Sequence, residues 1–214
     1  MREWVIAIVA ILALVTPYLL GWVRRAKLEI GIGQTTGEGR TWRFLHLTIY
    51  NKPLGRPWRW VERREPASGC HVKLAFIDSE TNETKFQPIL ARWSPTPEPL
   101  RITEIGGQLK QVVEPALVVA GERYSLDPTD EGANVAVAVK HEGENEAYAF
   151  NGYSYYYPKW SNPDWKLPQG EYIVRATAIS GQESVSREFK LVNRGVNFEN
   201  FRLETIANAK RQSS

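Results

Sequence analysis

The chain opens with one long apolar run before any alternation of apolar and polar residues begins. Positions 5–23, VIAIVAILALVTPYLLGWV, carry no charged residue. As a helix rising ~1.5 Å per residue, this stretch would extend for about 28 Å, close to the ~30 Å hydrocarbon core of a membrane. Trp4 and Trp22 flank it at the depths where aromatic residues are enriched. The run predicts a single N-terminal transmembrane helix.

A cleaved secretory signal is the alternative interpretation of this run. The apolar stretch exceeds the usual ~7–15 residues, and no small-x-small cleavage site follows it, so a retained anchor is favoured. Arg24, Arg25 and Lys27 follow the run directly, whereas Arg2 is the one basic side chain before it. The excess of positive charge predicts a cytoplasmic location for everything after the helix, in a single-pass membrane protein.

After position 27 the period of the pattern changes to two. Residues 28–32, 45–49 and 72–76 place apolar side chains at every second position, which is typical of half-buried antiparallel strands. Further strands are expected in NVAVAVKH, EAYAFN, EYIVRATAIS and SREFKLVN, with turn-rich segments between them. We therefore expect an all-β domain over residues 28–204, after the anchor and basic stop of residues 1–27. A flexible tail is expected at 205–214.

The segment LPQGEYIVRATA carries a resemblance to a known class of fold. Leu167, Gly170 and Tyr172, followed by alternating small and apolar residues, resemble the last strands of an immunoglobulin-like or fibronectin-type-III-like antiparallel β-sandwich. The resemblance implies that Tyr172 hydrogen-bonds back to the corner that precedes its strand. The layout of anchor, basic stop and sandwich also resembles uncharacterised single-span prokaryotic membrane proteins, which implies no particular activity.

Composition and motifs add little chemistry to this picture. The formal net charge is +3, and the sequence has no dense stripe of basic residues. No nucleic-acid partner is therefore expected. Cys70 is the single cysteine, which excludes an intrachain disulfide. The chain has no nucleophile elbow, no phosphate-binding glycine loop and no H-E-x-x-H motif. We therefore expect no enzymatic activity, no cofactor and no metal.

Basic and aromatic residues cluster close to the predicted membrane surface. In GRPWRWVERRE, Arg56 and Arg59 surround Trp58 and Trp60. Together with Arg24, Arg25 and Lys27, these arginines are candidates for contact with lipid headgroups. The competing interpretation is a loop whose tryptophans fold back on the sandwich.

The second aromatic cluster, NGYSYYYPKWSNPDW at 151–165, is the candidate site for a protein partner. An extended backbone would direct Tyr153, Tyr155 and Tyr157 to one side. We expect one set of rings and Trp165 to pack on the sandwich, while Trp160 and part of the tyrosine row form an exposed patch for a protein. The alternative is that the whole stretch only covers the core.

These features predict a membrane-anchored, non-enzymatic interaction or scaffold module with the lipid bilayer and an unidentified protein as partners. A periplasmic or cell-surface sandwich for adhesion or carbohydrate binding is the alternative, and it requires the opposite orientation in the membrane. A second alternative is an accessory subunit of a membrane enzyme complex.

Overall fold

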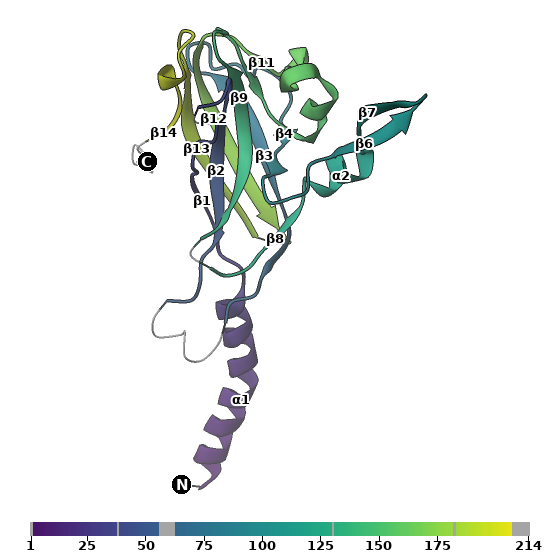
Figure 1. The fold of residues 1–214 in the computed structure, drawn as a ribbon. Helices are drawn as coiled ribbons and strands as arrows, with labels where there is room; N and C mark the ends of the chain where they lie inside the picture. The colour runs from purple at the N-terminus through teal and green to yellow at the C-terminus, as the bar shows by residue number, and fades with distance from the viewer. Residues whose placement is uncertain (1, 38, 56–62, 130, 182, 207–214) are drawn as a thin grey trace.

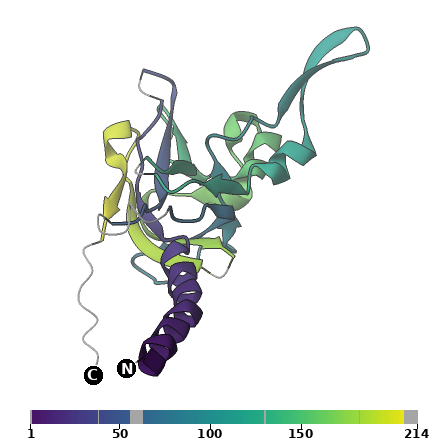
Figure 2. The same cartoon turned by 90° about the horizontal axis from the view of Figure 1, so that it is seen from below.

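The computed structural model describes residues 2–37, 39–55, 63–129, 131–181 and 183–206, with the backbone alone at residues 2, 3 and 5–8. Helix α1 (Arg2–Arg24) projects from one end of a β-sandwich, and a two-stranded arm projects from its side (Figures 1 and 2). The expected N-terminal helix is thus present. Across the described residues, no helix is both long and apolar enough to cross a membrane.

Two antiparallel sheets make up the sandwich. The first has the order β1 (Leu28–Ile32), β2 (Trp42–Asn51), β9 (Ala133–His141), β10 (Ala147–Ala149), β11 (Lys166–Leu167), with β5 (Arg92–Trp93) also paired to β9. The second has the order β14 (Phe201–Thr205), β13 (Glu183–Asn193), β12 (Gly170–Ser180), β3 (Ala67–Asp78), β4 (Ile89–Leu90), with β8 (Tyr124–Leu126) also paired to β3. The alternating sequence pattern therefore predicted β1, β2, β3, β9, β10, β12 and β13 and the all-β sandwich, whereas the short strands β4, β5, β8, β11 and β14 were not predicted.

The main core lies between the two sheets. Alternate residues of β3 and β12, such as Val72, Phe76 and Val174, are fully buried against the inner residues of β2 and β9. Strand β9 is buried on both faces for most of its length, because its outer face carries a second apolar cluster. That cluster consists of Phe44, Ala136, Val139 and Phe150.

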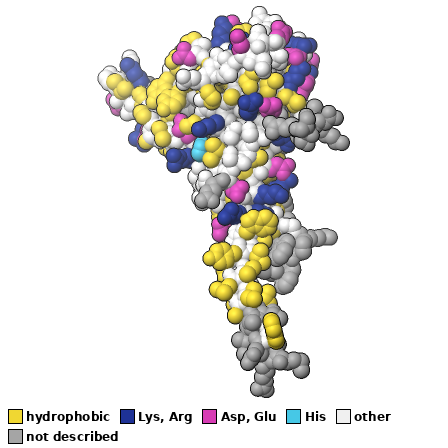
Figure 3. All heavy atoms as spheres, turned by 180° about the vertical axis from the view of Figure 1, so that it is seen from behind, with side chains coloured by type: hydrophobic (Ala, Val, Ile, Leu, Met, Phe, Trp, Pro, Cys, Tyr) yellow, Lys and Arg dark blue, Asp and Glu magenta, His cyan; other side chains and the backbone are white. Residues whose placement is uncertain are grey.

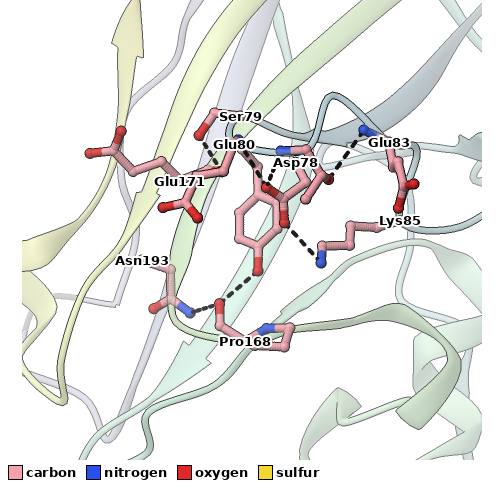
Figure 4. A network of polar contacts seen from close by, with 10 residues as sticks. Asp78, Ser79, Glu80, Glu83, Lys85, Pro168, Glu171 and Asn193 are labelled. Carbon is pink, nitrogen blue, oxygen red and sulfur yellow. Dashed lines mark hydrogen bonds and ion pairs between the residues drawn. The ribbon is translucent and has the colours of Figure 1, made fainter.

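Tyr172 occupies the corner position that the sequence predicted. Its side chain is buried, and its hydroxyl donates a hydrogen bond of 2.9 Å to the carbonyl oxygen of Pro168. The amide Nδ2 of Asn193 donates to the same oxygen at 3.0 Å (Figure 4). The corner before β12 is therefore held by two donors from different strands.

Helix α1 is fastened to the sandwich at its C-terminal end. The backbone N–H of Glu65 donates to the carbonyl of Arg24 at 2.7 Å, and the N–H of Lys27 donates to Oδ1 of Asn51 at 3.0 Å. Asn51 is fully buried and donates from Nδ2 to the carbonyls of Glu65 and Leu126. One side chain at the end of β2 thus ties three segments together where the helix meets the sandwich.

The arm was not predicted from the sequence. It consists of β6 (Leu100–Ile105) and β7 (Gln108–Val113), joined by Gly106 and Gly107. Both glycines have positive φ, 63° and 77°, as a type I′ hairpin turn requires. The Gly-Gly pair between two alternating runs was the available signal. The short helix α2 (Pro115–Ala120) follows, and Pro115 begins this helix, where its missing N–H costs nothing.

Candidate functional site

The aromatic stretch folds as a series of 3-10 turns. These are η1 (Gly152–Tyr156), η2 (Pro158–Trp160) and η3 (Pro163–Trp165), and a fourth turn, η4 (Phe198–Asn200), lies elsewhere. Asn151 starts η1 because its Oδ1 accepts from the N–H groups of Tyr153 and Ser154 at 2.8 and 3.2 Å. The prediction of an extended backbone, with Tyr153, Tyr155 and Tyr157 on one side, was wrong, since local capping bonds replaced the strand ladder.

The turns divide the tyrosines differently from strand parity. Residues i and i+3 of a 3-10 turn project in the same direction, and the rings of Tyr153 and Tyr156 lie 6.3 Å apart with 47% and 49% of each residue exposed. Tyr155 points the other way, with its ring 5.7 Å from that of Phe150. Tyr157 is half-buried between the two directions.

Trp160 packs against the outer face of the first sheet. Its ring lies edge-to-face with Phe44 at 5.2 Å, Trp42 at 5.9 Å and Tyr155 at 6.4 Å. Such contacts contribute about 0.5–1.5 kcal/mol each beyond the area they bury. Trp160 is therefore half-buried in the second apolar cluster instead of standing free as a patch. Trp165 packs against the main core, as expected.

A strained pair of residues holds Trp160 in this position. Lys159 and Trp160 both have left-handed backbones, with φ of 53° and 56°, and each such residue costs on the order of 1–3 kcal/mol. Nε2 of His141 donates to the carbonyl of Lys159 at 2.7 Å, and its ring lies parallel to that of Trp160 at 6.3 Å. His141 thus stabilises a conformation that the chain would not adopt alone.

Arg92 connects the aromatic turns to the base of the arm. Its buried guanidinium donates to the carbonyls of Leu117 in α2, at 3.0 Å, and Pro97. It also lies over the ring of Tyr155, 5.4 Å from the centroid. Burial lowers the pKa of Arg92 and raises the pKa of Tyr155, with the charge of Glu98 adding to the second shift. Tyr155 therefore stays a neutral phenol.

A groove of about 890 Å³ lies between the arm, the aromatic turns and the adjoining ends of β2 and β9. Its walls come from four places in the sequence. The lining residues are Thr41, Trp42, Leu100, Gln111, Val113, His141, Glu142, Gly143, Tyr155, Tyr156, Tyr157, Pro158, Lys159 and Trp160. We call this feature the aromatic groove. Its surface offers aromatic faces and a few polar groups, with one acidic and one basic side chain at Glu142 and Lys159.

The predicted partner-binding residues are divided by this geometry. Tyr155, Tyr157 and Trp160 line the aromatic groove, whereas Tyr153 faces a second cavity of about 410 Å³. Sequence analysis missed Trp42 and the contributions of the arm, such as Gln111. No local signal connected them with the aromatic stretch, because strand pairing and the path of the arm bring them together.

The predicted lipid-contact residues lie at the other end of the sandwich or outside the described residues. Arg24 ends α1, and Arg25 and Lys27 follow it with exposed side chains. The carbonyl of Arg25 accepts from Nη1 of Arg64. Arg56 and Arg59, with Trp58 and Trp60, lie in the segment 56–62, outside the described residues.

Within the part of the chain that the structure describes, no group of three or more His, Cys, Asp or Glu side chains is placed to hold a metal ion. Comparisons of the chain with protein-family models, with curated proteins and with solved structures found no match. The fold and the groove thus define the protein as a two-sheet antiparallel sandwich with a projecting N-terminal helix and a laterally placed aromatic groove.

Proposed function

We propose that this protein is a membrane-anchored, non-enzymatic interaction module that binds a partner protein in the aromatic groove. The observation that carries the proposal is the strained Lys159–Trp160 pair. Residues other than glycine keep a left-handed backbone only where the surrounding structure holds them in it, and they are concentrated at ligand-binding sites. Here the strain keeps an indole ring in the wall of an aromatic groove, and Trp and Tyr dominate the binding energy of protein interfaces.

The anchoring part of the proposal rests on α1. Most of its described side chains are exposed, among them Leu14, Tyr18 and Trp22. Figure 3 shows apolar side chains along the projecting helix. Exposed apolar surface of this extent is unfavourable in water. The uncharged run also includes positions 5–8, whose side chains lie outside the described part. The basic residues after α1 favour a cytoplasmic sandwich.

The distance between anchor and groove favours a protein partner over lipid. Strand β2 starts at Trp42 in the groove and ends at Asn51 beside the end of α1. Its ten residues extend for roughly 30 Å at ~3.3 Å per residue. A membrane around α1 would therefore lie about 30 Å from Trp42, out of reach for lipid headgroups. The likeness to immunoglobulin-like and fibronectin-type-III-like domains also belongs to this proposal, and the Tyr172 corner supports it.

Site-specific photocrosslinking in cells tests the groove. A benzoylphenylalanine in place of Tyr156, on the groove wall, is expected to yield one discrete adduct in intact cells. The same group in place of Arg175, an exposed position on β12 in the second sheet, is the matched control and is expected to yield none. Trp42→Ala should abolish the Tyr156 adduct. Equal adducts from both positions, or none from Tyr156, would contradict the proposal.

A membrane-impermeant thiol reagent tests the orientation. Glu80→Cys places a thiol on the exposed turn between β3 and β4, outside the aromatic groove and the arm. A cytoplasmic sandwich leaves this thiol unlabelled in intact cells and labelled after lysis. Labelling in intact cells would reverse the assignment and favour the alternative below.

Carbohydrate binding is a second candidate function, favoured by the second cavity. Tyr153, Tyr156 and Trp165 supply aromatic surface there, and Asn162 and Asp164 supply polar groups suited to sugar hydroxyls. This function requires the sandwich to face the cell exterior or periplasm. Binding of soluble oligosaccharides that is lost in Asp164→Ala, together with labelling of Glu80→Cys in intact cells, would establish it.

A further inference from the structure

The arm presents an open strand edge next to the aromatic groove. Its two strands form a separate sheet that pairs with neither sheet of the sandwich. Opposed residues run from Leu100 and Val113 to Ile105 and Gln108, without a register shift. The N–H of Glu114 donates to the carbonyl of Pro99 at 2.8 Å. Since bonded and non-bonded pairs alternate in an antiparallel ladder, this bond fixes which backbone groups point outward.

On β7, the outward-pointing backbone groups belong to Leu109, Gln111 and Val113. In the described part of the chain, no hydrogen bond outside the hairpin ladder reaches them. Edge strands in monomeric proteins are usually protected by a proline, a bulge or covering structure. Strand β7, QLKQVV, has neither a proline nor a bulge, and its charged side chain, Lys110, lies on the face opposite to that of Gln111 and Val113. The edge is therefore able to pair with another strand.

The side chains of these residues lie on the groove side of the arm. Opposed residues share a face of a hairpin, so Leu100, Gln111 and Val113 are on one face, and all three line the aromatic groove. Ile102 and Leu109 continue this face toward the tip, where they are 71% and 78% exposed. Gln111 and Glu104, which opposes Leu109, are the polar members of this face. The residues that offer free backbone groups thus belong to a mainly apolar face that continues into the groove.

We propose that β7 accepts an extended segment of a partner protein as a third strand, with every second side chain of that segment apolar and directed into the aromatic groove. This inference rests on the proposed function of the groove. A two-stranded hairpin is marginally stable alone, and a third strand with an apolar face stabilises it. In such strand addition, main-chain hydrogen bonds supply affinity, and pockets for alternate side chains supply specificity.

The choice of a peptide follows from the geometry of the edge. Backbone N–H and C=O groups that repeat along a strand match another extended backbone, whereas a glycan does not supply alternating amide donors and carbonyl acceptors at this spacing. The opposite charges of Glu142 and Lys159 leave the groove without a strong field of one sign, which favours an apolar segment over a charged one. Strand β7 is the binding edge because it supplies two of the three arm residues in the groove.

Proline substitution at an outward-pointing position tests the edge and keeps the hydrogen bonds between β6 and β7. Gln111→Pro removes one outward N–H and places a ring where the added strand would lie, and edge strands tolerate proline at such positions. Gln111→Ala removes the side chain and keeps the N–H. Ile102→Pro makes the same change on the outer edge of β6 and is the matched control.

The probe is a peptide selected from a library of short random sequences displayed on phage, panned against the full-length chain in detergent micelles. The selected sequences are expected to alternate apolar and other residues. A synthetic copy is expected to bind the unmodified chain and Ile102→Pro with similar affinity, and Gln111→Ala measures the contribution of the Gln111 side chain in the groove, so that any further loss in Gln111→Pro reports on the backbone edge. Gln111→Pro should weaken binding about tenfold or more, because a hydrogen bond and strand contact are lost together. If both proline variants melt at the same temperature as the unmodified chain, folding is unchanged.

Several results would overturn the inference. Selection of no peptide, selection of sequences without alternation, or unchanged binding by Gln111→Pro would each do so. If the Tyr156 crosslink forms while Gln111→Pro has no effect, strand addition is wrong and groove binding stands. If Gln111→Pro instead converts a dimer into a monomer in sedimentation velocity, the edge binds a second copy of this chain, and the partner segment is excluded.

Discussion

The hydroxyl of Tyr172 donates to the carbonyl oxygen of Pro168, four residues earlier, and closes the corner that leads into β12. The same oxygen accepts from Asn193 (Figure 4). Oδ1 of Asn193 accepts in turn from the buried ammonium of Lys140 at 2.6 Å. The corner is therefore one end of a polar network that joins β9, β12 and β13. This arrangement determines how sensitive the corner is to loss of one donor.

Tyr172→Phe is expected to lower the free energy of unfolding by about 1 kcal/mol. The change removes one hydrogen bond at nearly constant volume, and the Pro168 oxygen keeps its bond to Asn193. The loss of stability therefore lies at the low end of the range of about 1–3 kcal/mol for removing the partner of a buried polar group. Tyr153→Phe, at an exposed ring, is the control and should change stability by less than about 0.5 kcal/mol. Urea denaturation measures both. Equal effects would mean that the corner bond contributes nothing.

Gly121→Ala is expected to destabilise the protein by about 1–3 kcal/mol, as overpacking does. A Cβ at this position would lie 1.9 Å from Nη1 of Arg92, which is held by the carbonyls of Leu117 and Pro97. The backbone of Gly121 is right-handed, with φ of −69°, so displacement of Arg92 is the cause.

Gly55→Ala is the matched control, because a Cβ there meets nothing within 4 Å. Thermal unfolding compares the two variants. The photocrosslink from Tyr156 should also weaken in Gly121→Ala, since Arg92 supports Tyr155 in the groove. Similar melting temperatures for the two alanine variants would show that Arg92 moves aside without cost.

Cys70 is expected to resist thiol reagents as long as the protein is folded. The side chain is fully buried, and burial raises its pKa to about 12, so almost no thiolate forms near neutral pH. Modification should occur neither in intact cells nor in native lysate, and should follow global unfolding in denaturant. Cys70 therefore does not report on membrane orientation, and it does not interfere with Glu80→Cys as a reporter. Rapid labelling of the native protein would contradict its burial.

His46 is expected to make the protein less stable in mild acid. Burial lowers its pKa below 6.5, and the neutral ring donates from Nδ1 to the carbonyl of Gln34 at 3.0 Å. Between the folded-state pKa and 6.5, the unfolded chain binds a proton that the folded chain does not. The free energy of unfolding therefore falls as pH falls through this window, by at most about 1.4 kcal/mol per pH unit.

His46→Asn keeps an N–H donor and removes the titrating group. Urea denaturation at a series of pH values is expected to give a smaller loss of stability below pH 6.5 for this variant than for the unmodified chain. Parallel pH profiles would mean that His46 does not cause the acid sensitivity.

The sequence by itself predicted the long strands of the sandwich and the class of fold. Period-two alternation in residues such as Val72, Leu74 and Phe76 is a local consequence of burying one face of a strand. The Tyr172 corner was also predictable, because its bond joins residues four positions apart. The helix of residues 2–24 followed from its composition. In each of these cases, residues close together in the sequence determine the structural feature.

The tertiary structure decided where the aromatic side chains of 151–165 lie. A strand pattern and a series of capped turns compete for the same sequence, and Asn151 and Ser154 selected turns through bonds that alternation does not encode. The aromatic groove needs Trp42, Gln111 and Trp160, which lie far apart in sequence and meet through the pairing of β2 with β9 and the path of the arm. Because such contacts depend on closing long loops, no local pattern specified them, and the groove exists only in the folded chain.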